Sequence, residues 1–278
     1  MKSLFFTVAL LLPLLFAAPV DEEEMVTAPG GRRPKSSLFP IPEGGSINVS
    51  GNEVHVLDAS KNIVHIAQRD TVSPPEASGW IAYANVYNTG SPISSLTSTW
   101  SVPPFPQTPN HGQLLYLFNS IVPQASGAIL QPVLQFGISP AGGGKYWSVS
   151  NWFIDSSGTY FTPLVNVSVG QTLQGVMTLT SHTSTAYNYT SSFAGIPNQM
   201  VVTNTPLVLV WATETLETYG VTTGTDYPAG STTFSNINLR TIAGTPSVSW
   251  SVVNDVADGL YATVLRDGAT NATIQISY

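Results

Sequence analysis

The chain has 278 residues and no cysteine. A thiol nucleophile, a disulfide and any cysteine-ligated zinc or iron–sulfur site are therefore excluded. A domain of roughly 200 residues can bury enough apolar surface to fold without cross-links, so the core must supply the stability.

Charge is scarce as well, at 9% of residues against an average of about 25%. From residue 78 onward the only cations are Lys145, Arg240 and Arg266, too few for the basic stripe that nucleic acid binding requires. The histidines of the same region, His111 and His182, are far apart in sequence. We therefore expect no nucleic acid partner, no metal and no cofactor.

The sequence also lacks two functional motifs, the phosphate-binding loop of nucleotide-binding proteins and the nucleophile elbow of serine hydrolases. Gly142-Gly143-Gly144-Lys145 continues into Tyr146 and lacks the spacing of a phosphate-binding P-loop, so it predicts a hairpin turn. No Gly-x-Ser-x-Gly elbow is present, which disfavours a serine hydrolase of that type.

The chain has a single long apolar run, Leu4 to Leu15, which follows Met1-Lys2 and precedes Ala17. This pattern predicts a secretory signal peptide over residues 1–17, too short to span a membrane. We expect a secreted, extracellular glycoprotein that is monomeric, does not bind membranes and suits an acidic habitat, since its pI is near 4.9. The glycosylation sequons begin at Asn48, Asn166, Asn188 and Asn271.

Residues 18–77 predict a leader or pro-segment. Residues 18–50 are polar and proline-rich, with an acidic run and the pair Arg32-Arg33, and we expect no ordered structure there. Residues 53–67 instead alternate as a β-hairpin. This hairpin is either a pro-segment that docks on the main domain or the first hairpin of that domain.

Residues 78–278 show short apolar or alternating runs separated by Gly, Pro, Asn and Ser, without a helical period. The pattern predicts an all-β fold, an antiparallel β-sandwich. The expected strands are 80–87, 97–102, 114–121, 128–136, 146–154, 161–168, 172–181, 185–193, 207–217, 232–240, 248–253, 260–265 and 272–277.

Most of the functional information lies in the expected strand Ala128–Gly137. Alternation places Gln131 on one face with Ile129, Val133 and Gln135. Pro132 lacks a backbone N–H, which predicts an edge strand or a bulge just after Gln131. From these residues alone, a structural amide bonded to a neighbour is the better interpretation of Gln131.

Glu214 and Glu217 are the only glutamates after residue 78. Residues three apart on a strand point to opposite faces, so the pair does not form the two-carboxylate site of a glycosidase. Alternation groups Glu214 with Ala212 and Leu216, and with Val208 and Val210. A carboxyl on such an apolar face has a raised pKa and suits proton donation; the alternative is a strand-end glutamate in solvent.

The segment Ala128-Ile129-Leu130-Gln131 resembles the Ala-Ile-Leu-Gln strand of the glutamic peptidases (eqolisins). These are secreted acid proteases with a concanavalin A-like, lectin-type β-sandwich. The segment Trp211–Glu217 resembles the strand that carries the catalytic glutamate of the family. Further similar landmarks, spread over most of Trp80–Tyr278, are Gly79-Trp80, Val102-Pro103, Tyr146–Phe153, Val169–Leu173 and Thr233–Asn236.

The resemblance implies an endopeptidase in which Glu214 activates a water and then protonates the leaving amine, while Gln131 orients that water and stabilises the oxyanion. The substrate would be a polypeptide. The residues expected to line its groove are Phe118, Gln135, Trp147 and Asn151. The chain departs from the family at Val122 and Asn151, where the family has carboxylates, and in lacking its cysteines. These changes either alter the pH optimum or mark a relative that kept the fold and lost the activity.

The competing hypothesis is a non-catalytic, lectin-like module that binds a glycan. Trp147 and Trp152, with Tyr146 and Phe153, would then stack against sugars; the alternative for at least half of them is a position in the sandwich core. A third is an extracellular structural protein. Geometry separates the hypotheses, because the enzyme requires the Gln131 amide and the Glu214 carboxyl to share one water across one groove.

Overall fold

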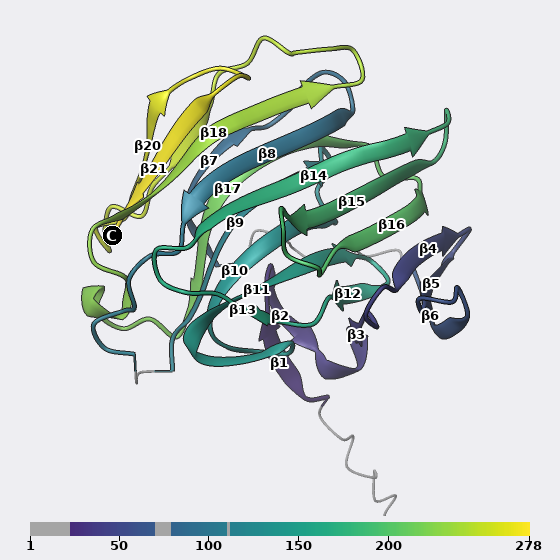
Figure 1. Ribbon diagram of the computed structural model, residues 1–278, viewed down its shortest axis with the longest axis horizontal. Helices are drawn as coiled ribbons and strands as arrows, with labels where there is room; N and C mark the ends of the chain where they lie inside the picture. The colour runs from purple at the N-terminus through teal and green to yellow at the C-terminus, as the bar shows by residue number, and fades with distance from the viewer. Residues whose placement is uncertain (1–22, 70–78, 110–111) are drawn as a thin grey trace, which may run out of the picture.

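The computed structural model describes residues 23–69, 79–109 and 112–278 (Figure 1). Within these ranges the chain forms strands and two short 3-10 segments, Lys35–Ser37 and Gly224–Asp226, and no α-helix. The described part contains no helix long and apolar enough to cross a membrane. The signal peptide expected over residues 1–17 lies outside the described residues.

Two large sheets stack face to face, which confirms the expected all-β sandwich (Figure 1). The nine-stranded sheet has the order β19-β7-β17-β9-β10-β11-β12-β3, with β13 beside β11. Its strands are β3 (Leu38–Pro40), β7 (Trp80–Val86), β9 (Leu114–Pro123), β10 (Ile129–Ser139), β11 (Gly142–Asp155), β12 (Gly158–Phe161), β13 (Val165–Asn166), β17 (Leu209–Tyr219) and β19 (Ser251–Val253).

The ten-stranded sheet has the order β20-β21-β18-β8-β14-β15-β16-β4-β5-β6. Its strands are β4 (Ser46–Ser50), β5 (Glu53–Leu57), β6 (Ile63–Gln68), β8 (Ile93–Ser101), β14 (Thr172–His182), β15 (Tyr187–Phe193), β16 (Met200–Thr205), β18 (Ser231–Thr241), β20 (Tyr261–Arg266) and β21 (Ala272–Ser277). Each expected strand of residues 78–278 has a counterpart. Residues 161–168 are interrupted between β12 and β13, and β16 was not expected.

The central strands of the nine-stranded sheet are buried on both faces. The face toward the ten-stranded sheet, here called the inner face, contributes Leu117, Leu134 and Leu216 to the main core. The opposite or outer face carries a second apolar cluster that includes Phe118 and Val133. Because both faces are covered, polar side chains on either face are removed from water.

Residues 25–50 are ordered, so the expectation of an unstructured leader was wrong. They form the hairpin β1 (Met25–Ala28) and β2 (Gly31–Pro34), followed by β3 and β4. β3 pairs in parallel with β12, and β4 pairs in parallel with β16. Several apolar residues of this leader, such as Ala28 and Ile47, are buried in the two apolar clusters of the main domain. Their own number is too small for a core, but a preformed surface supplies the missing partner.

The hairpin expected over 53–67 is confirmed as β5 and β6, and it continues the ten-stranded sheet through β4.

The expectation for Pro132 was wrong: β10 is central, between β9 and β11, and its bulge lies at Phe136/Gly137. The β9 ladder pairs Leu130 and then Val133, leaving out Gln131 and Pro132 without a change of register. The missing N–H of proline is thus accommodated by a local gap in one ladder.

Candidate functional site

Gln131 lies on the outer face of the nine-stranded sheet. Its alternation partners Ile129 and Val133 belong to the outer apolar cluster, as does Trp152, which pairs with it from β11. The Gln131 side chain is fully buried, and neither its amide nitrogen nor its oxygen makes a hydrogen bond. A buried amide without partners carries a desolvation penalty, so it does not serve stability.

Glu214 lies on the inner face. Its neighbours Ala212 and Leu216 belong to the main core, and it pairs with Ala84 and Asn119 on the adjoining strands. The carboxyl is fully buried between the sheets. Burial raises its pKa well above the usual range, while the hydroxyl of Ser98 on the facing sheet acts in the opposite sense. The interpretation as a solvent-facing strand end was therefore wrong.

The structure does not bring Gln131 and Glu214 together. Both belong to one sheet, but their side chains leave it through opposite faces, and the sheet itself lies between them. A shared water is excluded by this arrangement. The grouping of Glu214 with Val208 and Val210 also fails, because the β9–β17 register shifts between Leu209 and Trp211.

The carboxyl on the outer face belongs to Glu217, which sequence reasoning passed over. β17 presents Trp211 and Tyr219 to the outer cluster, and Glu217 lies on the same side. Its Oε1 accepts hydrogen bonds from the Tyr219 hydroxyl at 2.6 Å and from the backbone N–H of Gly30 at 2.7 Å. Its Oε2 accepts one from the Trp80 indole at 3.2 Å. The carboxyl is thus held by three donors from three separate segments.

Burial raises the pKa of Glu217 to about 8, although these three hydrogen bonds and the charge of Arg33 act to lower it. The side chain is 0% exposed. Glu217 also raises the pKa of its two tyrosine neighbours: burial acts first on both Tyr116 and Tyr219, and the carboxylate adds to it. In acid the covered carboxyl is therefore protonated and can donate a proton, as a general acid must.

Gln135 lies in the same cross-strand row as Glu217, with Tyr116 of β9 between them. Two strand spacings separate their backbones, about 10 Å. The Gln135 amide donates to the carbonyls of Gly137 and Gly142 at 2.9 Å each, and its oxygen makes no hydrogen bond. Gln131 lies two strands and four residues from Glu217, about 16 Å.

The expected hairpin turn at Gly142–Lys145 is shifted: Pro140 and Ala141 form the turn, and β11 begins at Gly142. The first residues of β11, just after the turn, include a position that requires glycine. A Cβ on Gly143, whose φ is +109°, would lie 2.4 Å from the Gln135 amide nitrogen. The glycines thus let the backbone close around the Gln135 side chain.

The other expected groove residues divide between the faces. Phe118 is on the outer face with Gln135. Trp147 is buried in the main core against Phe136. Asn151 is on the inner face, where its side chain binds Asn198 and Ser191 of the region around β15. Trp147 and Asn151 are therefore structural, and their assignment to a substrate groove was wrong.

The same division removes the proposed sugar platform. Trp152 faces outward and Phe153 inward, both are buried, and Tyr146 is 40% exposed. No two of these rings form an exposed stacking surface in the described structure. Among the sequons, Asn166 and Asn271 are exposed.

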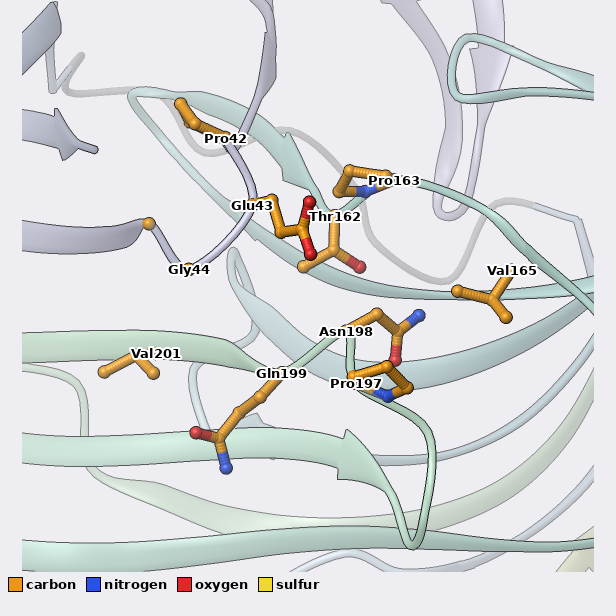
Figure 2. A pocket seen from close by; sticks show the side chains of 11 residues that line it. Pro42, Glu43, Gly44, Thr162, Pro163, Val165, Pro197, Asn198, Gln199 and Val201 are labelled. Carbon is orange, nitrogen blue, oxygen red and sulfur yellow. The ribbon is translucent and has the colours of Figure 1, made fainter. Parts of the chain in front are cut away.

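A cavity of about 440 Å³ lies where the N-terminal segment meets the main domain (Figure 2). It is lined by Pro42, Glu43, Gly44, Gly45, Thr162, Pro163, Val165, Pro197, Asn198, Gln199 and Val201. Its walls include three prolines and the polar side chains of Glu43, Thr162, Asn198 and Gln199, and Glu217, Gln131 and Gln135 are not among its lining residues. Among the described residues, no group of three or more His, Asp and Glu side chains could hold a metal ion.

No protein-family model matches this chain, and no curated protein matches it. Among solved structures, it is similar to Scytalido-glutamic peptidase with a peptide-based transition state analog, at 15% identity and a TM-score of 0.48. A second structure of that peptidase, with a transition state analog inhibitor, is 14% identical in sequence to this chain, with a TM-score of 0.49. Each match covers 72% of this chain and 98% of the other. At this similarity no residue of the present site is identified by the comparison.

Proposed function

We propose that this protein is a peptidase that works in acid and that Glu217 is its reactive carboxyl. One observation carries the proposal. The Glu217 carboxyl is fully buried on the outer face of the nine-stranded sheet, and it already accepts a hydrogen bond from a peptide N–H, that of Gly30, at 2.7 Å. A carboxyl that accepts a hydrogen bond from the backbone of a glycine-rich turn is suited to bind peptide main chain. A polypeptide is accordingly the substrate class.

The reaction is hydrolysis by an activated water. A water adds to the carbonyl carbon of the peptide, and the protonated Glu217 carboxyl gives its proton to the amide nitrogen as the C–N bond breaks. The proton that the added water releases passes to the Glu217 carboxylate. The products are a new carboxyl group and a new amine, and Glu217 returns to its starting state.

One tyrosine of this face can stabilise the oxyanion. The Tyr219 hydroxyl donates its single hydrogen to Glu217 at 2.6 Å, which leaves Tyr116 as the donor. Tyr116 lies between Glu217 and Gln135, its ring contacts that of Tyr219, and its hydroxyl is buried. A hydroxyl that is fixed by packing and aimed at a developing negative charge lowers the barrier without reorganisation. The Gln135 oxygen can accept a hydrogen bond from the attacking water.

A distant relationship to the glutamic peptidases accords with this function, with Glu217 in place of the expected Glu214. We further infer that the protein is secreted after removal of a signal peptide over residues 1–17 and glycosylated at its exposed sequons Asn166 and Asn271.

The test is cleavage of denatured casein by the purified protein across acid pH, with Glu217→Gln beside the wild type. Glutamine keeps the size of the side chain but cannot carry the proton. We expect the variant to lose cleavage by at least a hundredfold, the lower range for removal of a general acid–base group, with unchanged circular dichroism. Cleavage at the wild-type rate by a folded variant would exclude the proposal.

A further inference from the structure

The hairpin β1–β2 is buried at its tip, which is unusual for a surface hairpin. Residues Ala28–Gly31 are buried, as is Arg33 with 4% exposure, whereas Arg32 is exposed. Ala28 belongs to the outer apolar cluster together with Trp80 and Leu114. The tip is therefore inserted into the outer face, and it ends at the candidate reactive carboxyl.

The contacts at the tip are directed at Glu217. The Gly30 N–H donates to its Oε1 at 2.7 Å, and the charge of Arg33 acts on the same carboxyl. The Arg33 guanidinium also donates to the Gly30 carbonyl at 3.2 Å, which fixes the turn. Gly30 has a φ of +82°, a conformation that favours glycine. The tip presents only Ala28, Pro29 and two glycines, so little more than main chain meets the carboxyl.

The hairpin is a self-contained unit. Its base is closed by the hydrogen bond from the Lys35 N–H to the Glu24 carbonyl at 2.8 Å and by the ion pair between their side chains at 2.9 Å. Four residue pairs form its ladder, from Met25–Pro34 to Ala28–Gly31. It belongs to neither large sheet. No strand pairing has to break for the tip to leave the outer face.

The seam between the N-terminal segment and the main domain is loosely packed. The cavity of Figure 2 lies in it, with Pro42 to Gly45 on one side and residues 162–165 and 197–201 on the other. The two parallel pairings across the seam are short, three residue pairs for β3 with β12 and two for β4 with β16. Unfilled volume and short edge pairings indicate an interface between parts, unlike the close-packed core.

We propose that residues 23–34 are an autoinhibitory segment whose tip occupies the peptide site at Glu217, and that a substrate with small residues next to the scissile bond takes the same place. The inference rests on the proposed function. With the tip inserted, the attacking water and the substrate carbonyl have no access to the carboxyl. Displacement of the tip admits both and hydrates Glu217.

The first experiment uses the full chain with Arg33→Gln, which removes the guanidinium that fixes the turn, and with Arg32→Gln as the matched control. Both lose one charge from the same strand, but only Arg33 is buried at the tip. We expect Arg33→Gln to cleave casein about tenfold faster than wild type, the factor that 1.4 kcal/mol gives, and Arg32→Gln to be unchanged. A Gly30→Pro variant, which loses the N–H and cannot adopt a positive φ, should be faster still.

A synthetic peptide of residues 23–34 provides the test in trans. Added to the Arg33→Gln variant, it should restore inhibition. The same peptide with Gly30→Leu should not, because leucine does not favour the required φ and its side chain would point into the site. This arm does not depend on the folding of any further variant.

A second readout is independent of catalysis. Carbodiimide-driven coupling of an amine to accessible carboxyls, located by fragment mass spectrometry, reports whether Glu217 is covered. We expect little labelling in wild type and in Arg32→Gln, and at least fivefold more in Arg33→Gln. Glu214, three residues away but between the sheets, should stay unlabelled in all of them and serves as an internal control.

The outcomes separate the two claims. Increased labelling together with increased cleavage supports both. Increased labelling with no cleavage by any variant keeps the covering role of the hairpin and excludes the proposed function. Equal labelling and equal cleavage in wild type and Arg33→Gln, with no inhibition by the peptide, overturns the autoinhibitory role.

Discussion

Glutamine in place of Glu217 should flatten the pH dependence of stability. The ordinary pKa of this carboxyl is 4.5, and burial raises it to about 8 in the folded protein. The folded state therefore binds the proton more tightly than the unfolded state. The resulting stabilisation is complete below pH 4.5 and is lost as pH rises through about 8.

The size of the effect follows from the same two values. At 1.36 kcal/mol per pKa unit, the difference between 4.5 and about 8 is worth on the order of 5 kcal/mol. The side chain is fully buried, so solvent screening does not reduce this figure appreciably. The wild type should therefore lose up to about 5 kcal/mol more of its free energy of unfolding than Glu217→Gln between these pH values.

Urea denaturation at a series of pH values measures the difference directly. Glu43→Gln, a change at an exposed glutamate, is the matched control and should follow the wild type within about 0.5 kcal/mol. If the wild type and Glu217→Gln keep a constant difference across the range, Glu217 titrates alike in both states. That result would contradict the claim that the Glu217 carboxyl is buried and covered in the folded protein.

Three further substitutions test the outer face. Gly143→Ala should destabilise by about 1–3 kcal/mol, since the new Cβ would lie 2.4 Å from the Gln135 amide; an unchanged thermal midpoint contradicts this packing. Gln131→Met should stabilise by about 1 kcal/mol in urea, because the buried amide makes no hydrogen bond; a loss of stability would show that the amide is satisfied. Trp80→Phe removes a donor at 3.2 Å and should raise the pKa of Glu217 further, as carbon-detected NMR titration can show; a fall would contradict the contact.

Strand existence could be predicted well from the sequence because it depends on local alternation. The expected strands from residue 80 onward, and the hairpin at 53–67, have counterparts in the structure. β1 to β4 could not be predicted in the same way. Their few apolar residues become buried only because the main domain offers a surface, which is a tertiary effect with no local signal.

For the candidate site, the sequence predicted the burial of single residues but not which of them lie together on one face of the sheet. Alternation correctly separated Glu214 from Glu217 and correctly placed Glu214 among apolar residues, with a raised pKa. It could not say which of the two faces of β17 matches the face of β10 that carries Gln131, because this depends on the order and register of strands β17, β9 and β10. Because paired residues of neighbouring strands point to the same face, the strand register places Glu217, and not Glu214, on the face that carries Gln131.

The role of Glu217 is tested most directly in the protein with the hairpin tip released. In the Arg33→Gln background, casein cleavage should fall at least a hundredfold on Glu217→Gln, the lower range for an acid–base group. It should change less than about threefold on Glu214→Gln, provided that this variant folds. The two carboxyls are on one strand and equally buried, but they occupy opposite faces, and Glu217 accepts hydrogen bonds from Gly30, Trp80 and Tyr219. Loss of cleavage in Glu214→Gln with full retention in Glu217→Gln would contradict the outer-face site.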